Sequence, residues 1–330
     1  MIMDTGSANL WVLDSGCETV NKILRCPRYC QNDIFCLSFC QPVCCNAVTI
    51  DDYCYGRPRF CSNQSTTYKT TSRTFQIVYG TGSAAGIVGK ELVQVGSLTI
   101  ENADLGQASQ IDEFFASGIV DGIFGMGQIG LAKSGTIPPL YSAVSQGLML
   151  PYFTFWLDSN GLHSNFGKGG EITYGDVDID HCGPVYWIPL SSNTYWQFRV
   201  EHLKIGNQYV GFGEGISDTG TSFLGLPPLA INVIKTLTNF RQSQVYGYIV
   251  DCNTTISLVF SINGKQFTVA QEQLVLEAYH YGGQKLCVLA IFSTEDAPMM
   301  PKYLLGDPFI RSYCQVYDME NRRIGFAKSL

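Results

Sequence analysis

The sequence predicts a mainly β protein made of two similar lobes, and two observations support this fold class. First, the motif D-T-G-[ST] occurs twice, at residues 4–7 and 218–221, each time with apolar residues on both sides. A single copy is expected by chance about 0.01 times in a chain of this length, so a pair indicates an internal repeat. Second, short segments of alternating apolar residues recur, and the 34 glycines are enough to turn many short strands.

A β-hairpin is predicted in the first half of the chain, at about residues 75–90. Phe75, Ile77 and Tyr79 alternate with polar residues up to the glycine-rich turn Y-G-T-G-S, and apolar positions in residues 87–95 lead away from it. The hairpin is therefore expected to carry Tyr79 close to its tip.

Further elements repeat behind the two motifs. The segments V-D-G-I-F-G-M-G and Y-L-L-G-D-P-F place Gly122 and Gly306 at matching positions, once the longer first half is allowed for. A Pro-Pro pair also opens a predicted helix in each half. The apolar residues at helical spacing are Leu140, Val144 and Leu148 in the first helix, and Leu229, Val233 and Leu237 in the second.

Composition and charge exclude several function classes. The 330 residues suffice for about two domains, and only 15% of them are charged. The net charge of −7 reflects few Lys and Arg residues, and without a basic stripe we expect no nucleic-acid partner. The longest clean apolar run, residues 286–292, is too short to span a membrane. The sequence therefore predicts a soluble globular protein.

Thirteen cysteines are many for a reduced compartment, and nine of them lie within residues 17–61. This density is typical of disulfides formed on a secretory route, and sequons at Asn63 and Asn253 agree with that route. Zinc binding is the alternative, but the segment contains no His and no C-x-x-C, which favours disulfides. Because nine is odd, at least one of these thiols pairs outside the segment or stays free. No signal peptide begins at Met1, so we expect the chain to be incomplete at its start.

Five segments together resemble those of a known family. They are D-T-G-S-A-N-L-W-V, Y-G-T-G-S, V-D-G-I-F-G-M-G, S-D-T-G-T-S-F and L-L-G-D-P-F-I-R-S-Y-C-Q-V-Y-D-M-E-N-R-R-I-G-F-A. In this order and approximate spacing they resemble the pepsin-like aspartic peptidases over nearly the whole chain. The resemblance implies a two-lobed pepsin-like acid protease fold, with a cleft between pseudo-symmetric lobes at residues 1–178 and 179–330. Residues 17–61 form an insertion in the first lobe, with a role in stabilisation, substrate exclusion or docking to a partner.

Asp4 and Asp218 are the predicted catalytic residues. Two carboxylates held within a few ångströms cannot both ionise easily, so they share one proton. The ionised carboxylate can act as general base on a bound water, while the protonated one polarises the peptide carbonyl and then assists the leaving amine.

The remaining motif residues are expected to support this pair. The glycine of each motif lets a backbone amide approach the carboxylate. By resemblance, the threonine after each aspartate locks the two loops together, and the last motif residue hydrogen-bonds the outer carboxylate oxygen. The supporting residues are Thr5, Gly6, Ser7, Thr219, Gly220 and Thr221.

By resemblance, the hairpin of about residues 75–90 is a mobile flap over the cleft. Tyr79, hydrogen-bonded to Trp11, then helps to position the substrate, together with Gly80 and Thr81 at the tip. An ordinary hairpin with an exposed aromatic residue is the alternative interpretation.

The resemblance also implies a pocket beside the scissile bond. Val120 and Ile123, and by a looser resemblance Phe114 or Phe115, are expected to line it. Core packing is the alternative role for such residues. If they line the pocket, substrates with apolar or aromatic residues at the cut are preferred.

Disulfide partners are also implied by the resemblance. Cys252 and Cys287 are expected to pair in the second lobe, and Cys17 belongs to a small loop disulfide near the flap. Cys182 and Cys314 are left over and are candidates to bridge each other.

One further motif and two further functions fit parts of the sequence. The segment G-M-G-Q-I-G matches a dinucleotide fingerprint, but Gly135 and Pro138 interrupt the required helix and no ribose-binding carboxylate follows. We therefore predict no cofactor and no metal. A catalytically silent binding protein on the same fold, or an inactive fragment that lacks the N-terminal strand, is the alternative function. Ser217, where the family often has an apolar residue, is a mild departure.

The expected function is thus an aspartic endopeptidase with an acidic pH optimum. Protein or peptide substrates and pepstatin-type inhibitors are the expected ligands. Both aspartates lie in one chain, so a retroviral-type homodimer is not needed and a monomer is expected. The cysteines, the sequons and the family together predict a glycosylated zymogen that is secreted or lysosomal.

Overall fold

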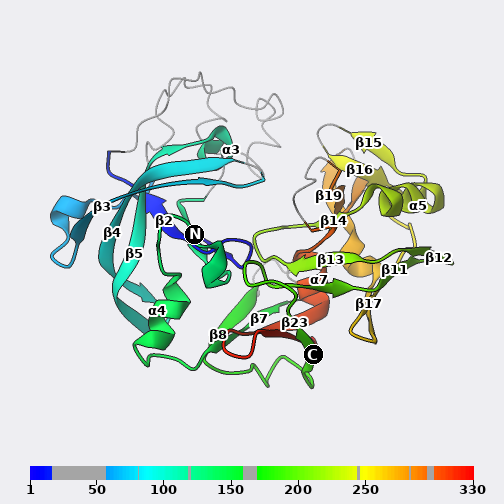
Figure 1. Cartoon of the computed structure of the whole chain (residues 1–330). Helices are drawn as coiled ribbons and strands as arrows, with labels where there is room; N and C mark the ends of the chain where they lie inside the picture. The colour runs from blue at the N-terminus through cyan, green and yellow to red at the C-terminus, as the bar shows by residue number, and fades with distance from the viewer. Residues whose placement is uncertain are drawn as a thin grey trace. The chain divides into compact units, whose positions relative to one another are not determined.

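The computed structural model describes residues 1–16, 57–80, 82–117, 120–158, 169–243, 246–281, 284–295 and 301–330. The chain divides into two compact units, residues 1–148 and 149–330. Strands greatly outnumber helices (Figure 1), which confirms the predicted mainly β class. Cys17, Thr81 and most of the predicted insertion lie outside the described residues.

The first unit is built on a six-stranded sheet with the order β1-β6-β2-β5-β4-β3. Its last three strands form the antiparallel meander in blue to teal in Figure 1. The strands are β1 Ile2–Asp4, β2 Leu10–Leu13, β3 Lys69–Val78, β4 Ser83–Val95, β5 Leu98–Ile111 and β6 Gly122–Gly125. The helices are η2 Ser62–Gln64, α3 Glu113–Ser117, η3 Ile129–Leu131 and α4 Pro139–Ser145. The predicted hairpin is confirmed as β3 and β4.

The core of the first unit follows from the alternation within these strands. Phe75 and Ile77 point to the same face of β3 and are buried, while their neighbours are exposed. They join Trp11, Phe115 and Ile123 in one buried cluster. This cluster is the support on which the half-site described below is built.

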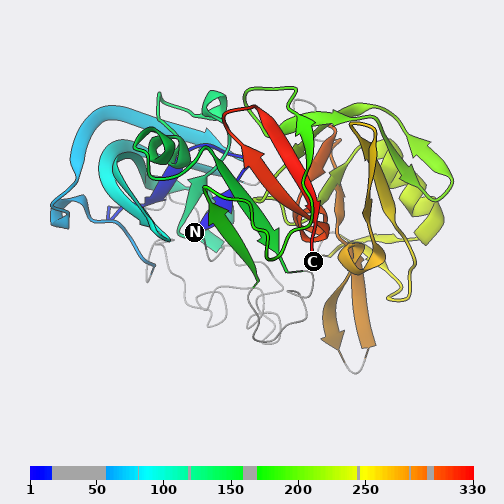
Figure 2. The ribbon, with the colours of Figure 1, turned by 90° about the horizontal axis from the view of Figure 1, so that it is seen from below.

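The second unit contains four sheets, whose orders are β10-β13-β22-β14-β21, β12-β11-β17-β18, β15-β16-β20-β19 and β8-β7-β23-β24-β9. In Figure 2 the red arrows of β23 and β24 lie beside the green arrows of β7 and β8. The first strands are β7 Tyr152–Leu157, β8 Gly170–Tyr174, β9 Tyr186–Pro189, β10 Gln197–Val200, β11 His202–Ile205, β12 Gln208–Val210, β13 Gly213–Ser217, β14 Leu224–Leu226 and β15 Arg241–Ser243. The later strands are β16 Gly247–Val250, β17 Leu258–Ile262, β18 Lys265–Val269, β19 Val275–Tyr281, β20 Gln284–Leu289, β21 Ile291–Ser293, β22 Tyr303–Leu305, β23 Tyr313–Asp318 and β24 Arg323–Lys328. The helices are α5 Pro228–Thr238, α6 Gln271–Leu274 and α7 Asp307–Ser312.

The division between the units falls before β7, whereas the lobe boundary predicted from the sequence follows residue 178. Strands β7 and β8 count with the second unit because β7 pairs with β23 along four residue pairs. The position of the lobe boundary itself stays a prediction.

Both predicted helices exist, but the apolar face expected for each is wrong in part. Helix α4 ends at Ser145, so Leu148 lies beyond it and is 40% exposed. Helix α5 buries Ala230, Ile231 and Ile234 against β11, β12 and β21. Leu229 and Leu237 are exposed instead, at 58% and 56%. An α-helix has about 3.6 residues per turn, so positions spaced four apart turn progressively around the helix axis. Leu229, Val233 and Leu237 therefore do not all lie on the face that packs.

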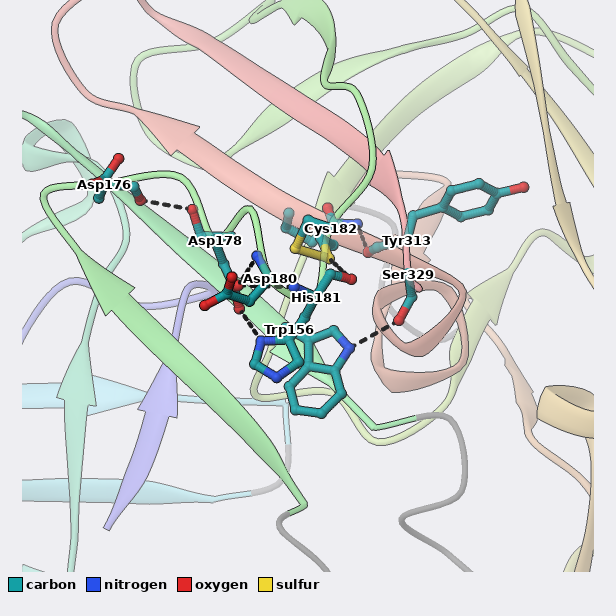
Figure 3. Close-up of a disulfide and its surroundings, with 11 residues drawn as sticks. Trp156, Asp176, Asp178, Asp180, His181, Cys182, Tyr313 and Ser329 are labelled. Carbon is teal, nitrogen blue, oxygen red and sulfur yellow. Dashed lines mark hydrogen bonds and ion pairs between the residues drawn. A yellow bond between two sulfur atoms is a disulfide. The ribbon is translucent and has the colours of Figure 1, made fainter.

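Two disulfides of the second unit confirm the predicted pairs, Cys182–Cys314 and Cys252–Cys287. Figure 3 shows the first, at the start of β23, with the Trp156 and His181 rings stacked beside it. Cys61, from the predicted insertion, is in no disulfide. It therefore provides the unpaired thiol that the odd number of cysteines allowed.

Candidate active site

The first half-site lies where β1 ends at Asp4. β1 pairs in parallel with β6, and Asp4 stands opposite Gly125. The Asp4 carboxylate is 5% exposed and accepts two hydrogen bonds from its own motif. The Gly6 amide donates to Oδ1 at 2.8 Å, and the Ser7 hydroxyl donates to Oδ2 at 2.5 Å. The motif therefore fixes both carboxylate oxygens.

The second half-site repeats this arrangement just after β13. Strand β13 pairs in parallel with β22, and the Asp218 amide donates to the Leu305 carbonyl at 3.1 Å. The Asp218 carboxylate is 8% exposed. The Gly220 amide donates to Oδ1 at 2.9 Å, and the Thr221 hydroxyl donates to Oδ2 at 2.6 Å. The contacts that the sequence analysis expected for Gly6, Ser7, Gly220 and Thr221 are thus present within each motif.

Strand register corrects one detail of the internal repeat. Leu10 pairs with Phe124, and Leu224 pairs with Leu305, so Gly125 is the equivalent of Gly306. The predicted match of Gly122 with Gly306 is therefore wrong by three residues. Both equivalent positions need glycine. At position 125 an added Cβ would lie 2.4 Å from the Asn9 amide nitrogen, and at position 306 it would lie 2.0 Å from the Thr221 carbonyl oxygen.

Tyr79, near the tip of the predicted flap, is tied to the first half-site. The Trp11 Nε1–H donates to the Tyr79 hydroxyl oxygen at 2.8 Å, as the resemblance implied. The Phe115 ring lies edge-on to Tyr79, with ring centroids 5.4 Å apart. Burial raises the pKa of Tyr79 well above its usual range, and the charge of Asp4 adds to this effect, while hydrogen bonds with Trp11 and Ser7 oppose it. Tyr79 therefore remains a neutral hydroxyl that can donate a proton in a hydrogen bond.

The predicted pocket residues differ in burial. Ile123 is 3% exposed and belongs to the core cluster, and Val120 is half-buried against it. Of the two phenylalanines, Phe115 packs against Tyr79 while Phe114 is 45% exposed. Phe115 is thus a direct neighbour of Tyr79, and Val120 packs against the same core cluster as Tyr79. Gly80, also on the flap, is exposed, and an added Cβ there would have nothing within 4 Å.

The second motif has an acidic neighbour, Asp307, for which the sequence predicted no role. Burial raises the pKa of the Asp307 carboxyl, although the Arg311 guanidinium 3.3 Å away opposes the change and the charge of Asp218 reinforces it. The equivalent position beside the first motif is Met126. A second missed residue is Arg57, whose contacts depend on the tertiary fold and leave no local sequence signal.

Some predicted contacts join residues of different units. The pairing of Asp4 with Asp218, and the lock between Thr5 and Thr219, therefore stay predictions. Among the described residues, no cluster of His, Cys, Asp or Glu could hold a metal ion. Within the same residues, no helix combines the length and apolar character needed to cross a membrane.

Comparison with known proteins agrees with this geometry. Residues 1–329 match the family described as eukaryotic aspartyl protease. The chain is 36% identical to aspartic protease 1 of Caenorhabditis elegans over 338 residues, covering 100% of this chain and 78% of that protein. It is 36% identical to aspartic protease 2 of Necator americanus, covering 99% and 79%. It is 32% identical to gastricsin of Suncus murinus, covering 99% and 77%. The chain belongs to the eukaryotic aspartyl protease family of peptide-bond hydrolases.

Proposed function

We propose that Asp4 and Asp218 act together as the catalytic pair of an acid endopeptidase. The observation that carries this proposal is the matching support of the two carboxylates. In each motif a glycine amide binds Oδ1 and a hydroxyl binds Oδ2. Such support holds each carboxylate in one orientation, which is what a shared general acid and base requires.

The proposed reaction needs only a water molecule and one shared proton. The ionised carboxylate takes a proton from the water as its oxygen attacks the peptide carbonyl carbon, while the protonated carboxylate gives its proton to the carbonyl oxygen. The tetrahedral diol then collapses as one carboxyl gives its proton to the departing amine nitrogen and the other carboxylate takes a proton from a diol hydroxyl, so the pair again holds one proton. No covalent link to the enzyme forms. The pair works at acidic pH because one proton must remain on it.

The first unit supports a preference for apolar residues beside the cut. The buried Phe115 ring packs against Tyr79, and the half-buried Val120 side chain packs against the same core cluster. The substrates are proteins or peptides, and statine-type inhibitors such as pepstatin are expected to compete with them. The two buried or half-buried disulfides of the second unit agree with a secreted or lysosomal location, where thiols are oxidised.

The experiment that tests this proposal is the cleavage of a fluorogenic peptide with two phenylalanines at the cut, between pH 2 and pH 7. Asp218→Asn should lose at least about 10²- to 10⁴-fold in kcat, because it removes one of the two groups that move protons. Asp180→Asn, an exposed aspartate of the same unit, is the matched control and should retain full activity. Pepstatin should abolish the activity of the wild type.

Two results would contradict the proposal. Asp218→Asn with wild-type activity would remove the second aspartate from the chemistry. A folded wild type that binds pepstatin but cleaves no peptide at any pH would favour the alternative, a silent binding protein.

A further inference from the structure

The side chain of Arg57 is buried and directs its donors to one stretch of the first unit. It is only 9% exposed. Its Nε–H donates to Asp121 Oδ1 at 2.9 Å, and one terminal nitrogen donates to the Phe115 carbonyl at 2.8 Å. The other terminal nitrogen donates to the Val120 carbonyl. All three acceptors lie between the end of β5 and the start of β6.

Two of these acceptors belong to residues of the core region that Tyr79 packs against. The Phe115 ring lies 5.3 Å from Trp11 and 5.4 Å from Tyr79, measured between ring centroids. Val120 packs against the same core cluster. Arg57 therefore binds the backbone of Phe115, which contacts Tyr79, and of Val120, which packs against the core cluster that Tyr79 also contacts. We call the side chains of Phe115 and Val120 the apolar wall.

We propose that Arg57 is a positioning residue for this apolar wall, and that through the wall it determines how well the enzyme binds a large apolar side chain at the cut. The proposal rests on the proposed peptidase function and adds a specificity determinant to it. Arg57 touches no reacting atom. It acts by holding the backbone of Phe115 and Val120 at a fixed distance from Tyr79.

The choice of arginine follows from the geometry of the acceptors. A planar guanidinium offers donors in a fixed fork, so it can bind two carbonyls and a carboxylate at once. A lysine ammonium is a compact point charge and cannot hold the same three acceptors in that arrangement. Removal of the side chain need not unfold the unit, because the Asp121 side chain is 34% exposed and water can take over its hydrogen bond.

The test compares Arg57→Ala and Arg57→Lys with the wild type. Arg59→Ala is the matched control, since Arg59 is two residues away and exposed. Two fluorogenic peptides are used at acidic pH, one with phenylalanine on both sides of the cut and one with alanine there. Hydrogen exchange of the peptide that contains Phe115, Val120 and Asp121 provides a readout that is independent of catalysis.

For Arg57→Ala we expect KM for the phenylalanine peptide to rise about tenfold, the effect of losing charge-assisted hydrogen bonds, while kcat changes less. KM for the alanine peptide should change little, and hydrogen exchange in the segment should become faster. Arg57→Lys should give an intermediate result, and Arg59→Ala should match the wild type.

Unchanged exchange in Arg57→Ala, equal changes of KM for both peptides, or full recovery in Arg57→Lys would each overturn the inference. A wild type that cleaves neither peptide would instead refute the proposed function, and with it the role of Arg57 in substrate binding. In that case the exchange experiment still decides whether Arg57 holds the segment.

Discussion

Removing the Cys182–Cys314 disulfide should destabilise the second unit more than removing the Cys252–Cys287 disulfide. The change is Cys182→Ala with Cys314→Ala, and the comparison is the same double substitution in the other pair. Alanine is chosen because Cys314 is 0% exposed, so a serine there would bury a new hydroxyl.

The expected magnitude follows from the chain that each bond closes. The first bond joins residues separated by 132 positions, and the second joins residues separated by 35. The loop-entropy relation then gives about 5 kcal/mol for the first bond and about 4 kcal/mol for the second. The first pair is also more deeply buried, so its loss removes more packing. We expect a difference of about 1 kcal/mol or more in the free energy of unfolding.

Urea unfolding followed by far-UV circular dichroism measures this difference, and tryptophan fluorescence adds a local signal. Trp156 stacks on His181 at 3.9 Å and donates to the Ser329 hydroxyl at 2.9 Å, so its emission reports on the region around the first disulfide (Figure 3). A Trp156→Phe background identifies that signal. If the Cys182–Cys314 variant were as stable as the other, or more so, the loop-entropy reasoning would be refuted.

Two other predictions concern buried polar groups. Burial alone would raise the pKa of Asp104, but hydrogen bonds from Arg73, Lys90 and a backbone amide, with the Lys90 charge, hold it below its ordinary value. The stability that ionised Asp104 contributes is therefore present at neutral pH and is lost as pH falls through the lowered pKa. Asp104→Asn should lower the free energy of unfolding by about 1–3 kcal/mol at pH 7 and by much less at pH 2. Urea unfolding at both pH values measures the difference. Ser217→Ala removes a buried hydroxyl that lies 2.8 Å from the Tyr317 hydroxyl, and should cost about 1–2 kcal/mol. The same hydroxyl donates to Gln315 Oε1 at 3.0 Å. Thermal unfolding of this variant measures the cost, and an unchanged melting temperature would contradict the prediction.

Local chemistry explains which features the sequence could predict. The carboxylate support arises within four consecutive residues, so the D-T-G-S and D-T-G-T motifs define it without knowledge of the fold. The β3–β4 hairpin is similarly encoded by alternation around a glycine-rich turn. The Trp11–Tyr79 bond joins residues 68 positions apart, and only resemblance to a family made it predictable.

Features that depend on packing between distant elements were missed. Helix α5 shows its apolar residues at several angles, and only the position of β11 and β12 decides that Ile231 is buried and Leu237 is not. Arg57 is a similar case, because its acceptors are contributed 58 and 63 residues further along the chain. Nothing in the residues beside Arg57 indicates that its side chain is buried.

The two half-sites share their carboxylate support but not their surroundings, and the strand register shows why. Trp11 pairs with Ile123, and the equivalent residue of the second unit, Gly225, pairs with Leu304. A Cβ at position 225 would lie 2.9 Å from Leu304 Cβ, so no counterpart of Trp11 can stand there to hold a second flap. At the position equivalent to Met126 the second half has Asp307, a carboxyl whose pKa is raised by burial and by the charge of Asp218. The proposed mechanism gives the two carboxylates different roles, and the residues around the two half-sites differ in the way that such a division of roles would need.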